Sequence, residues 1–292
     1  MTVLGTASRP RELTVYDDPA ALSAVTSAAR WIGRPVVLVP TMGALHAGHR
    51  SLIRAARAVP DAAVVVSIFV NPLQFDARAD LERYPRQLDA DLAVCRQEGV
   101  ELVFTPSVEA MYPSGSSTTV APGALGAELE GASRPGHFVG VLTVVAKLFG
   151  IVGPERALFG EKDYQQLVLI QQMVADLQLG VQIVGLPTVR DADGLAVSSR
   201  NVHLDPAARA VAPTLPAALS AGARAGRHGR EAVLAAAHEV LSGQPDLVLD
   251  YLALRDPQLG PAPQRGAARL LVAATVGGVR LIDNICVQMG GS

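Results

Sequence analysis

Two histidines three residues apart, His46 and His49, lie in a segment whose residue types suit the binding of phosphate groups. The segment, residues 40–49, reads PTMGALHAGH and follows an apolar run at residues 34–40 that is typical of a buried strand. A helical pattern of apolar residues comes next. The two histidines therefore lie on one face at the start of a helix, where unpaired N–H groups and the helix dipole favour anions.

This arrangement allows both imidazoles to donate hydrogen bonds to a triphosphate, and a bound polyphosphate would favour their charged form. Gly48 has no side chain, so a flat base or a sugar can approach the backbone there, and Gly43 gives the turn the same freedom. The spacing alone is also compatible with a metal site or with ordinary surface histidines. The segment lacks the Gly-Lys-Ser/Thr of a Walker loop.

Polar side chains also follow the next expected strand. Asn71 and Gln74 come just after its end, where side chains reach the ligand crevice of an open parallel sheet. Their amides suit a hydroxyl or a carboxylate. An Asn-Pro turn with a purely structural role is an equally good interpretation.

Residues 159–166 (FGEKDYQQ) repeat the order of strand, glycine, charged residues and helix. Lys162 at this bend is placed to contact phosphates as a point charge. For Asp163 alone, the pattern favours a role as the cap of the following helix. Gln166 lies one turn into that helix, near the same mouth.

Two further segments supply phosphate-binding or carboxylate-binding groups. Ser198, Ser199 and Arg200 end a polar loop at residues 189–201, which is either a lid over the site or a plain linker. Arg134 and His137 precede an apolar helix and either enter the site or form a structural turn. No protein ligand of a metal is assigned, because the acidic residues Asp89 and Asp91 are unevenly placed.

The elements that must position these residues alternate between strand and helix, which predicts an α/β fold with a parallel sheet and helices on both faces. The strands are expected at residues 34–40, 62–70, 100–104, 157–159 and 181–186, and the helices at residues 48–57, 81–98, 139–151 and 164–177. A loop rich in Ser, Thr, Pro and Gly is expected at residues 114–126.

The composition changes after about residue 201. An Ala-rich helical region at residues 205–243 is followed by three expected strands at residues 247–254, 269–276 and 279–287, the last two joined by a tight turn at Gly277 and Gly278. This pattern predicts a small α+β domain with an antiparallel sheet. We therefore expect two domains, residues 1–188 and residues 189–292.

Composition restricts the partners. The formal net charge of the 292 residues is −2, so no global field draws the protein to nucleic acid or to an anionic membrane. The first ten residues lack a signal pattern, and the longest apolar stretch, residues 139–152, is too short to span a bilayer. Cys95 and Cys286 are expected to be reduced thiols. These features indicate a cytoplasmic protein.

Taken together, four motifs resemble the pantothenate synthetase (pantoate–β-alanine ligase) family over nearly the whole chain. They are PTMGALHAGH at residues 40–49, FVNPLQF at 69–75, FGEKDYQQ at 159–166 and VSSRN at 197–201. The segments LEG at 129–131 and RPGHF at 134–138 most resemble the actinobacterial members.

The resemblance implies a Rossmann-like nucleotidylyltransferase domain with a smaller C-terminal domain, commonly as a homodimer. It also implies a two-step reaction with ATP and Mg²⁺. The carboxylate of pantoate attacks the α-phosphate of ATP to give pantoyl adenylate and pyrophosphate, and β-alanine then attacks the adenylate to give pantothenate and AMP.

The same resemblance implies roles for individual residues. His46 and His49 contact phosphates together with Lys162 and Arg200, and His49 is the expected proton donor. Gln74 and Gln166 hold pantoate, with Asn71 and Arg134 nearby. The expected ATP-binding residues are Met42, Gly43, Ala44, Leu45, His46, Ala47, Gly48, His49, Gly160, Glu161, Lys162, Asp163, Val189, Val197, Ser198, Ser199 and Arg200. The family commonly has Met at the position of Val197. A contact made there through the backbone would tolerate this difference.

Two other functions remain open at this point. One is a nucleotidyltransferase with the same histidine motif that makes a dinucleotide-like product. The other is a catalytically silent nucleotide-binding protein, which the intact set of His46, His49, Lys162 and Arg200 disfavours.

Overall fold

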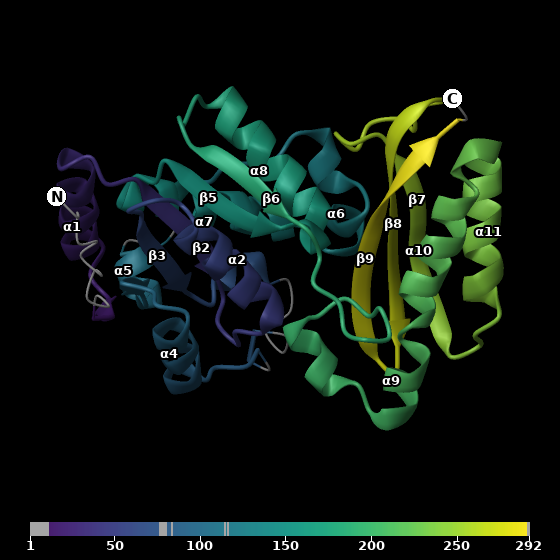
Figure 1. Ribbon diagram of the computed structural model, residues 1–292, viewed down its shortest axis with the longest axis horizontal. Helices are drawn as coiled ribbons and strands as arrows, with labels where there is room; N and C mark the ends of the chain where they lie inside the picture. Colours follow the sequence, from purple (N-terminus) through teal and green to yellow (C-terminus); the bar gives the residue numbers. More distant parts are fainter. Residues whose placement is uncertain (1–11, 76–80, 83, 114, 116, 291–292) are drawn as a thin grey trace, which may run out of the picture.

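The computed structural model describes residues 12–75, 81–82, 84–113, 115 and 117–290, and over them the chain forms two separate sheets (Figure 1). The first is a six-stranded parallel sheet with the order β1-β4-β3-β2-β5-β6. Its strands are β1 (Thr14–Tyr16), β2 (Val36–Thr41), β3 (Ala63–Ile68), β4 (Leu102–Phe104), β5 (Arg156–Gly160) and β6 (Gln182–Leu186). The expected α/β fold is confirmed.

Helices cover both faces of this sheet because successive strand residues point to opposite sides. Val36 and Leu38 pack with α1 (Pro19–Trp31), α7 (His137–Val152) and α8 (Tyr164–Asp176). Val37 and Val39 pack with α2 (Ala47–Arg57) and α4 (Leu88–Gln97) on the other face. Both faces are buried, which explains why these strands read as continuous apolar runs.

The strand order places a topological switch between β2 and β5. From β2 the chain builds outward through β3 to β4, and it then returns to the other side of β2 as β5. Ligands of open parallel sheets bind where the order reverses, at the carboxyl ends of the strands. The segment after β2 carries His46 and His49, and the segment after β5 carries Lys162.

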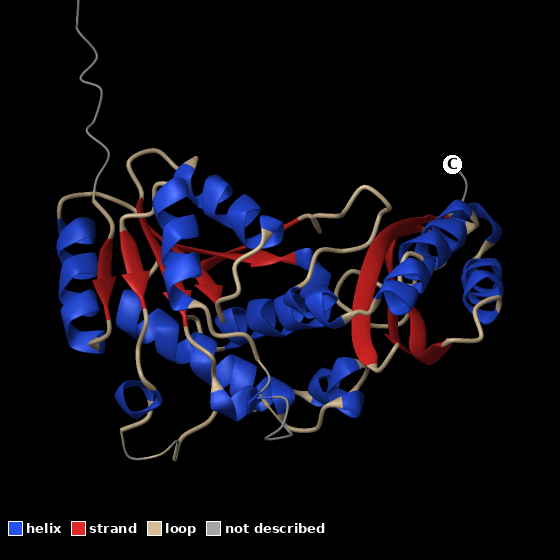
Figure 2. Cartoon of the chain, turned by 90° about the horizontal axis from the view of Figure 1, so that it is seen from below, coloured by secondary structure: helices blue, strands red, loops and turns tan. Residues whose placement is uncertain are grey.

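The second sheet is antiparallel and contains β7 (Leu247–Arg255), β8 (Gly266–Val276) and β9 (Val279–Met289). Helices α10 (Thr214–Arg224) and α11 (Arg230–Ser242) pack on one face of this sheet, away from the six-stranded sheet (Figures 1 and 2). Gly277 and Gly278 join β8 to β9 with φ values of 55° and 76°. Because side chains rarely adopt such angles, the glycine pair permits the tight turn that the sequence predicts.

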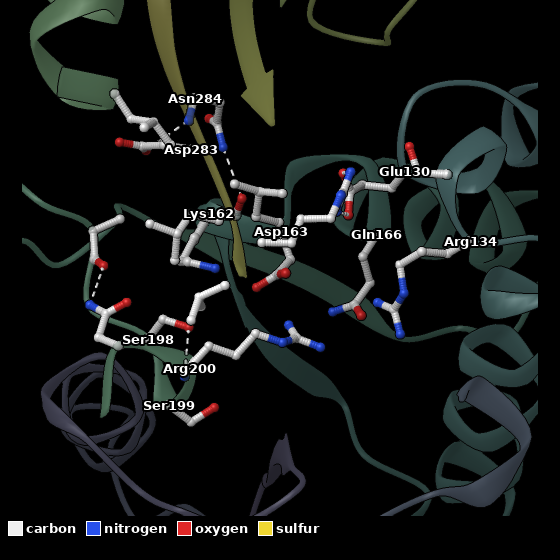
Figure 3. A pocket seen from close by; sticks show the side chains of 18 of the residues that line it. Glu130, Arg134, Lys162, Asp163, Gln166, Ser198, Ser199, Arg200, Asp283 and Asn284 are labelled. Atoms are coloured by element: carbon white, nitrogen blue, oxygen red, sulfur yellow. Dashed lines mark hydrogen bonds and ion pairs between the residues drawn. The ribbon is translucent and has the colours of Figure 1, made fainter. Parts of the chain in front are cut away.

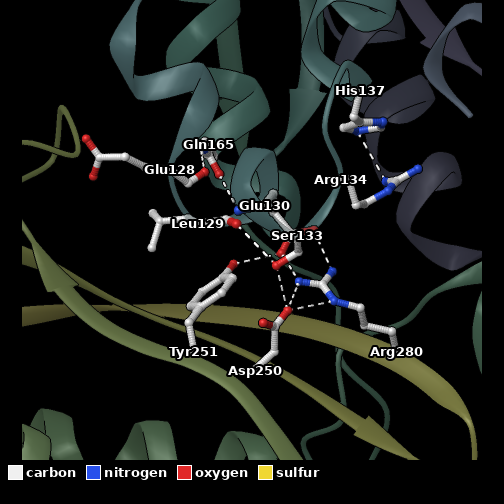
Figure 4. Close-up of polar contacts among 10 residues, drawn as sticks. All are labelled: Glu128, Leu129, Glu130, Ser133, Arg134, His137, Gln165, Asp250, Tyr251 and Arg280. Carbon is white, nitrogen blue, oxygen red and sulfur yellow. Dashed lines mark hydrogen bonds and ion pairs between the residues drawn. The ribbon is translucent and has the colours of Figure 1, made fainter. Parts of the chain in front are cut away.

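Charged side chains join the second sheet to a short helix of the first part (Figure 4). Arg280 of β9 binds both carboxylate oxygens of Glu130 at 2.7 and 2.8 Å. The hydroxyl of Tyr251 donates to Glu130 at 2.9 Å, and Ser133 donates to Asp250 at 2.8 Å. The short helix that carries Glu130 is thereby fixed to the antiparallel sheet, four residues before Arg134.

One expected helix is interrupted. The pattern predicts a helix over residues 81–98, but although Leu81 and Glu82 are helical, residues 84–87 are not, and α4 begins at Leu88. Pro85 lacks an N–H and restricts the residue before it, and the side chain of Arg86 bonds the carbonyl oxygen of Leu81 at 3.0 Å instead. The tight bend so formed brings Tyr84 toward the crevice. The expected boundary between domains at residue 188 stays a prediction.

The remaining elements are short. They are η1 (Pro72–Gln74), α5 (Val108–Met111), η2 (Ala124–Ala127), α6 (Glu130–Ser133), η3 (Glu161–Asp163), η4 (Ser199–His203), α9 (Pro206–Val211) and η5 (Gly226–His228). The first ten residues, expected to lack a signal, lie outside the described residues. Within the described part of the chain, no helix has the length and apolar character needed to cross a bilayer.

Candidate active site

His46 and His49 form a reciprocal cap at the start of α2. The Nδ1 atom of His46 accepts the N–H of Gly48 at 3.1 Å, and the Nδ1 atom of His49 accepts the N–H of His46 at 3.2 Å. An acceptor nitrogen carries no proton, so each neutral ring holds its proton on Nε2. Both rings line the cavity described below, with their centroids 4.1 Å apart.

Both imidazoles are neutral donors in the free protein. Burial, followed by the charge of Lys162, lowers the pKa of His46 to about 4. Burial, followed by the neighbouring His46, lowers the pKa of His49 to about 3. Gly48 is needed for this geometry, since a Cβ there would lie 2.9 Å from Cε1 of His46.

Asp91 supports the turn before the histidines, a role that no sequence pattern indicates. Its two carboxylate oxygens accept the N–H groups of Ala44 at 3.0 Å and Leu45 at 2.7 Å. Gly43 and Ala44 have φ values of 85° and 50°, and a Cβ on Gly43 would lie 2.8 Å from an Asp91 oxygen. The buried carboxylate therefore stabilises a left-handed turn that a non-glycine residue rarely adopts.

The bend after β5 places Lys162 and Asp163 on the cavity wall. The expected capping role of Asp163 is wrong, because its side chain makes no capping hydrogen bond to α8. Although the surrounding protein disfavours its charge, the cations Lys162 and Arg200 hold the pKa of Asp163 below its usual value. Asp163 is therefore an ionised group among cations, facing the same space as Gln166 and Arg200 (Figure 3).

The loop from Val189 to Arg200 forms the opposite wall. The N–H of Val197 donates to the carbonyl oxygen of Val189 at 2.9 Å, and the hydroxyl of Ser198 accepts the N–H of Arg200 at 3.2 Å. Tyr84 also lies on this wall, where its hydroxyl is hydrogen-bonded to Ser199. Tyr84 was missed from the sequence because its place depends on the bend at Pro85.

An amide network follows the end of β3, and its member Gln74 lines the cavity. Gln74 donates from Nε2 to the sulfur of Met42 at 2.8 Å and accepts at Oε1 from Asn71 at 3.1 Å. Asn71 also donates to the carbonyl oxygen of Gly140 at 3.0 Å and accepts from the hydroxyl of Tyr112 at 2.9 Å. The side chain of Asn71 therefore bonds to other groups of the protein, and it orients the amide of Gln74.

His137 has the opposite tautomer. Its Nδ1 atom lies 2.8 Å from the carbonyl oxygen of Gln74, which only accepts, so Nδ1 carries the proton. Its Nε2 atom then accepts from Arg134, 3.3 Å away. Burial, followed by the charge of Arg134, lowers the pKa of His137. The pair fixes the guanidinium of Arg134 at the Gln74 end of the cavity.

Most of these groups line a cavity of about 230 Å³, which shares Lys162, Asp163 and Arg200 with the wall of a larger cavity of about 590 Å³ beside the antiparallel sheet. Apolar side chains form one side of the smaller cavity: Phe69, Val141, Val144, Val145, Leu148 and Phe159. Four of these residues lie on α7, and the apolar helix expected at residues 139–151 gave no sign of which face meets a ligand.

Most of the expected site residues lie on the walls of these cavities. They are Met42, His46, Gly48, His49, Gln74, Arg134, Gly160, Lys162, Asp163, Gln166, Val189, Val197, Ser198, Ser199 and Arg200. Gly43, Ala44, Leu45, Ala47, Asn71 and Glu161 are not among the residues that line either cavity. Within the described ranges, no group of three or more His, Cys, Asp or Glu side chains is arranged to hold a metal ion.

Comparison with known proteins gives a consistent result. Residues 14–286 match the model of the family described as pantoate-beta-alanine ligase. The chain is 63% identical over 284 residues to the pantothenate synthetase of Nocardia farcinica, covering 97% of this chain and 89% of that one. It is 62% identical over 281 residues to that of Mycolicibacterium smegmatis, covering 96% and 90%. The expected resemblance to actinobacterial members is confirmed.

Solved structures agree with the fold. The pantothenate synthetase of Thermus thermophilus superposes with a TM-score of 0.86 at 46% identity, covering 94% of this chain and 99% of the other. The pantoate-beta-alanine ligase of Francisella tularensis, solved as a complex with beta-gamma ATP and beta-alanine, gives a TM-score of 0.79 at 34% identity, covering 94% and 97%.

Proposed function

The chain belongs to the pantoate–beta-alanine ligase family, and from this premise we propose that it condenses pantoate with β-alanine in the smaller cavity, at the carboxyl ends of β2 and β5, using ATP and a pantoyl adenylate intermediate. One observation supports the proposal: two kinds of binding group line the same cavity. Phosphate-binding donors come from His46, His49 and Lys162, and carboxylate-binding or hydroxyl-binding amides come from Gln74 and Gln166.

In the first step, a carboxylate oxygen of pantoate bonds to the α-phosphorus of ATP, and the bond from that phosphorus to the β-phosphate bridging oxygen breaks. Negative charge grows on the departing pyrophosphate. The reciprocal cap holds the rings of His46 and His49, so their Nε2–H groups stabilise this charge without rearrangement, and the ammonium of Lys162 adds a positive charge. Ser198, Ser199 and Arg200 act on the phosphates from the opposite wall.

Pantoate is proposed to lie between the amides and the apolar wall. Gln74 and Gln166 bind its hydroxyl and carboxylate oxygens, while its two methyl groups face Val141, Val144 and their neighbours. Asn71 acts indirectly. Its Nδ2 group donates to Oε1 of Gln74, which fixes the orientation of the Gln74 side-chain amide. Arg134 supplies a cation for substrate carboxylates at this end.

In the second step, the amine of β-alanine attacks the acyl carbon, and the bond from that carbon to the phosphate oxygen breaks as AMP leaves. The attacking nitrogen loses a proton as the amide forms. The walls around the adenylate exclude water, which would otherwise hydrolyse it.

Mg²⁺ is proposed to be held mainly by phosphate oxygens and water. Among the described residues that line the smaller cavity, Asp163 is the one carboxylate, and it already lies among cations. This donor set fits a metal that arrives with the nucleotide. We also propose a homodimer, which sedimentation equilibrium tests, and a boundary between two domains at residue 188.

Pyrophosphate exchange into ATP tests the reaction. We expect exchange that requires pantoate and Mg²⁺ but not β-alanine, and AMP release that requires both substrates. Exchange that is independent of pantoate would instead support a nucleotidyltransferase of another kind. A chain that binds ATP but catalyses neither process would be a silent nucleotide-binding protein.

A further inference from the structure

Two adjacent residues of the antiparallel sheet, Asp283 and Asn284 of β9, bond to two of the segments that carry the proposed phosphate-binding groups, the bend with Lys162 and the loop with Arg200. Figure 3 shows both residues beside Lys162. Each is 3% exposed. They line the larger cavity but are not among the residues that line the smaller one. Buried polar side chains require partners, and here the partners are parts of the proposed ATP site.

Asn284 holds the bend after β5. Its Nδ2 group donates to the carbonyl oxygens of Glu161 at 2.9 Å and Lys162 at 3.0 Å. Its Oδ1 atom accepts from Arg269 at 3.0 Å. Both Nδ2 protons of Asn284 therefore bond to the short segment that carries the Lys162 side chain. The guanidinium of Arg269 holds the Oδ1 atom.

Asp283 holds the loop on the other wall. Its carboxylate binds Arg190 in a bidentate pair at 2.6 and 2.9 Å, and Arg190 also donates to the carbonyl oxygen of Gly194 at 2.9 Å. The N–H of Asn284 donates to Asp283 at 2.7 Å, which links the residue that holds the bend after β5 to the residue that holds the loop. Ser198 and Arg200 lie at the far end of the loop that Arg190 begins.

We propose that Asp283 and Asn284 are a positioning pair that sets the location of Lys162 relative to Arg200 for the adenylation step. This inference rests on the proposed function. The two cations belong to different segments, and both segments bond to adjacent residues of β9. Since misplacement of a transition-state group by about 1 Å can cost on the order of 10²-fold in rate, such a fixed spacing has catalytic value.

The variant Asn284→Asp tests the contacts of Asn284 with little change of shape. It keeps an oxygen beside Arg269 but replaces both donors with an oxygen that faces two carbonyl oxygens. We expect pantoate-dependent pyrophosphate exchange to fall by roughly tenfold or more, by analogy with a misplaced catalytic group. The KM for β-alanine should be unchanged. Asn284→Ser, which is smaller, serves if Asn284→Asp does not fold.

A double-mutant cycle with Lys162→Ala separates positioning from general loosening. If Asn284 acts through Lys162, Asn284→Asp should reduce exchange by less than about twofold in the Lys162→Ala background, whereas its effect on thermal stability should be the same in both. Cys286→Ser, two residues further along the same strand at an exposed position, is the control and should leave exchange unchanged.

The outcomes are distinguishable. A wild-type protein without pantoate-dependent exchange defeats the proposed function itself. If wild-type exchange is normal but the effects of the two substitutions multiply, only the positioning role is contradicted. Full exchange in both Asn284 variants would contradict it as well.

Discussion

The Nδ1 atom of His49 accepts the backbone N–H of His46 at 3.2 Å, so one ring of the histidine pair holds the main chain that carries the other. This bond leaves Nε2–H of His49 free to act on a ligand. The capping and donor functions of His49 therefore belong to different atoms of one ring, and a substitution can separate them.

The variant His49→Asn keeps an acceptor near the Nδ1 position and removes the Nε2–H donor. We expect its thermal stability to stay near that of the wild type, while turnover falls on the order of 10²–10³-fold, as for the loss of one transition-state donor. His49→Ala should lose both turnover and stability. Near-normal turnover in His49→Asn would exclude the proposed role of Nε2.

Stability should fall below pH 6.5 because both histidines have lowered pKa values in the folded protein, about 4 for His46 and about 3 for His49, against 6.5 for an unperturbed histidine. The unfolded chain takes up protons as the pH falls through 6.5, whereas the folded chain does not. The stabilisation is complete above pH 6.5 and is lost toward pH 4, by at most about 1.4 kcal/mol per histidine for each pH unit.

Denaturant unfolding between pH 7.5 and pH 5.5 measures this effect. The variant His49→Asn should show a shallower loss of unfolding free energy over this range, because one of the two groups is gone. An unchanged slope in that variant would show that other groups cause the pH dependence.

The substitution Asp91→Asn tests the support of the histidine turn. The amide has one oxygen to accept the two N–H groups of Ala44 and Leu45, so one of them loses its partner, at a cost of about 1–3 kcal/mol in stability. We expect the KM for ATP to rise, since the displaced turn carries His46. Asp89→Asn, an exposed position on the same helix, is the matched control and should change neither quantity.

Two glycines of α7 provide a second matched pair. A Cβ at Gly140 would overlap the carbonyl oxygen of Leu73, whereas a Cβ at Gly150 would meet nothing within 4 Å. We expect Gly140→Ala to displace Gln74, raise the KM for pantoate and lower the melting temperature. Gly150→Ala should be neutral or stabilising, by about 0.5–1 kcal/mol from helix propensity. Equal effects of the two substitutions would contradict the close-contact explanation.

Sequence reasoning succeeded where a strand, a turn and a polar residue follow one another in the chain. His46, Lys162 and Gln74 each come directly after a buried strand, so the parallel fold fixes the edge at which they lie. It failed where a residue acts through distant contacts. Asp91 bonds residues 46 and 47 positions earlier, and Asn284 bonds residues 122 and 123 positions earlier. No local pattern distinguishes such side chains from ordinary helix or strand residues.

Asp163 illustrates a different difficulty. An aspartate before a helix is a strong capping signal, yet the carboxylate of Asp163 lies among Lys162, Arg200 and the other cations of the cavity. The charged side chains around it come from its neighbour Lys162 and from two other segments, those of Arg134 and Arg200, and a single sequence does not reveal that these segments meet.

The bond from Asn284 to the carbonyl oxygen of Lys162 also sets an order of events during synthesis. The lysine precedes the amide that holds it by 122 residues. At 5–20 residues per second, translation separates the two by on the order of ten seconds. During that interval the nascent chain has its histidine turn and its lysine but not the strand that holds the segment of the lysine. We therefore expect a ribosome-bound chain that lacks β9 not to consume cellular ATP.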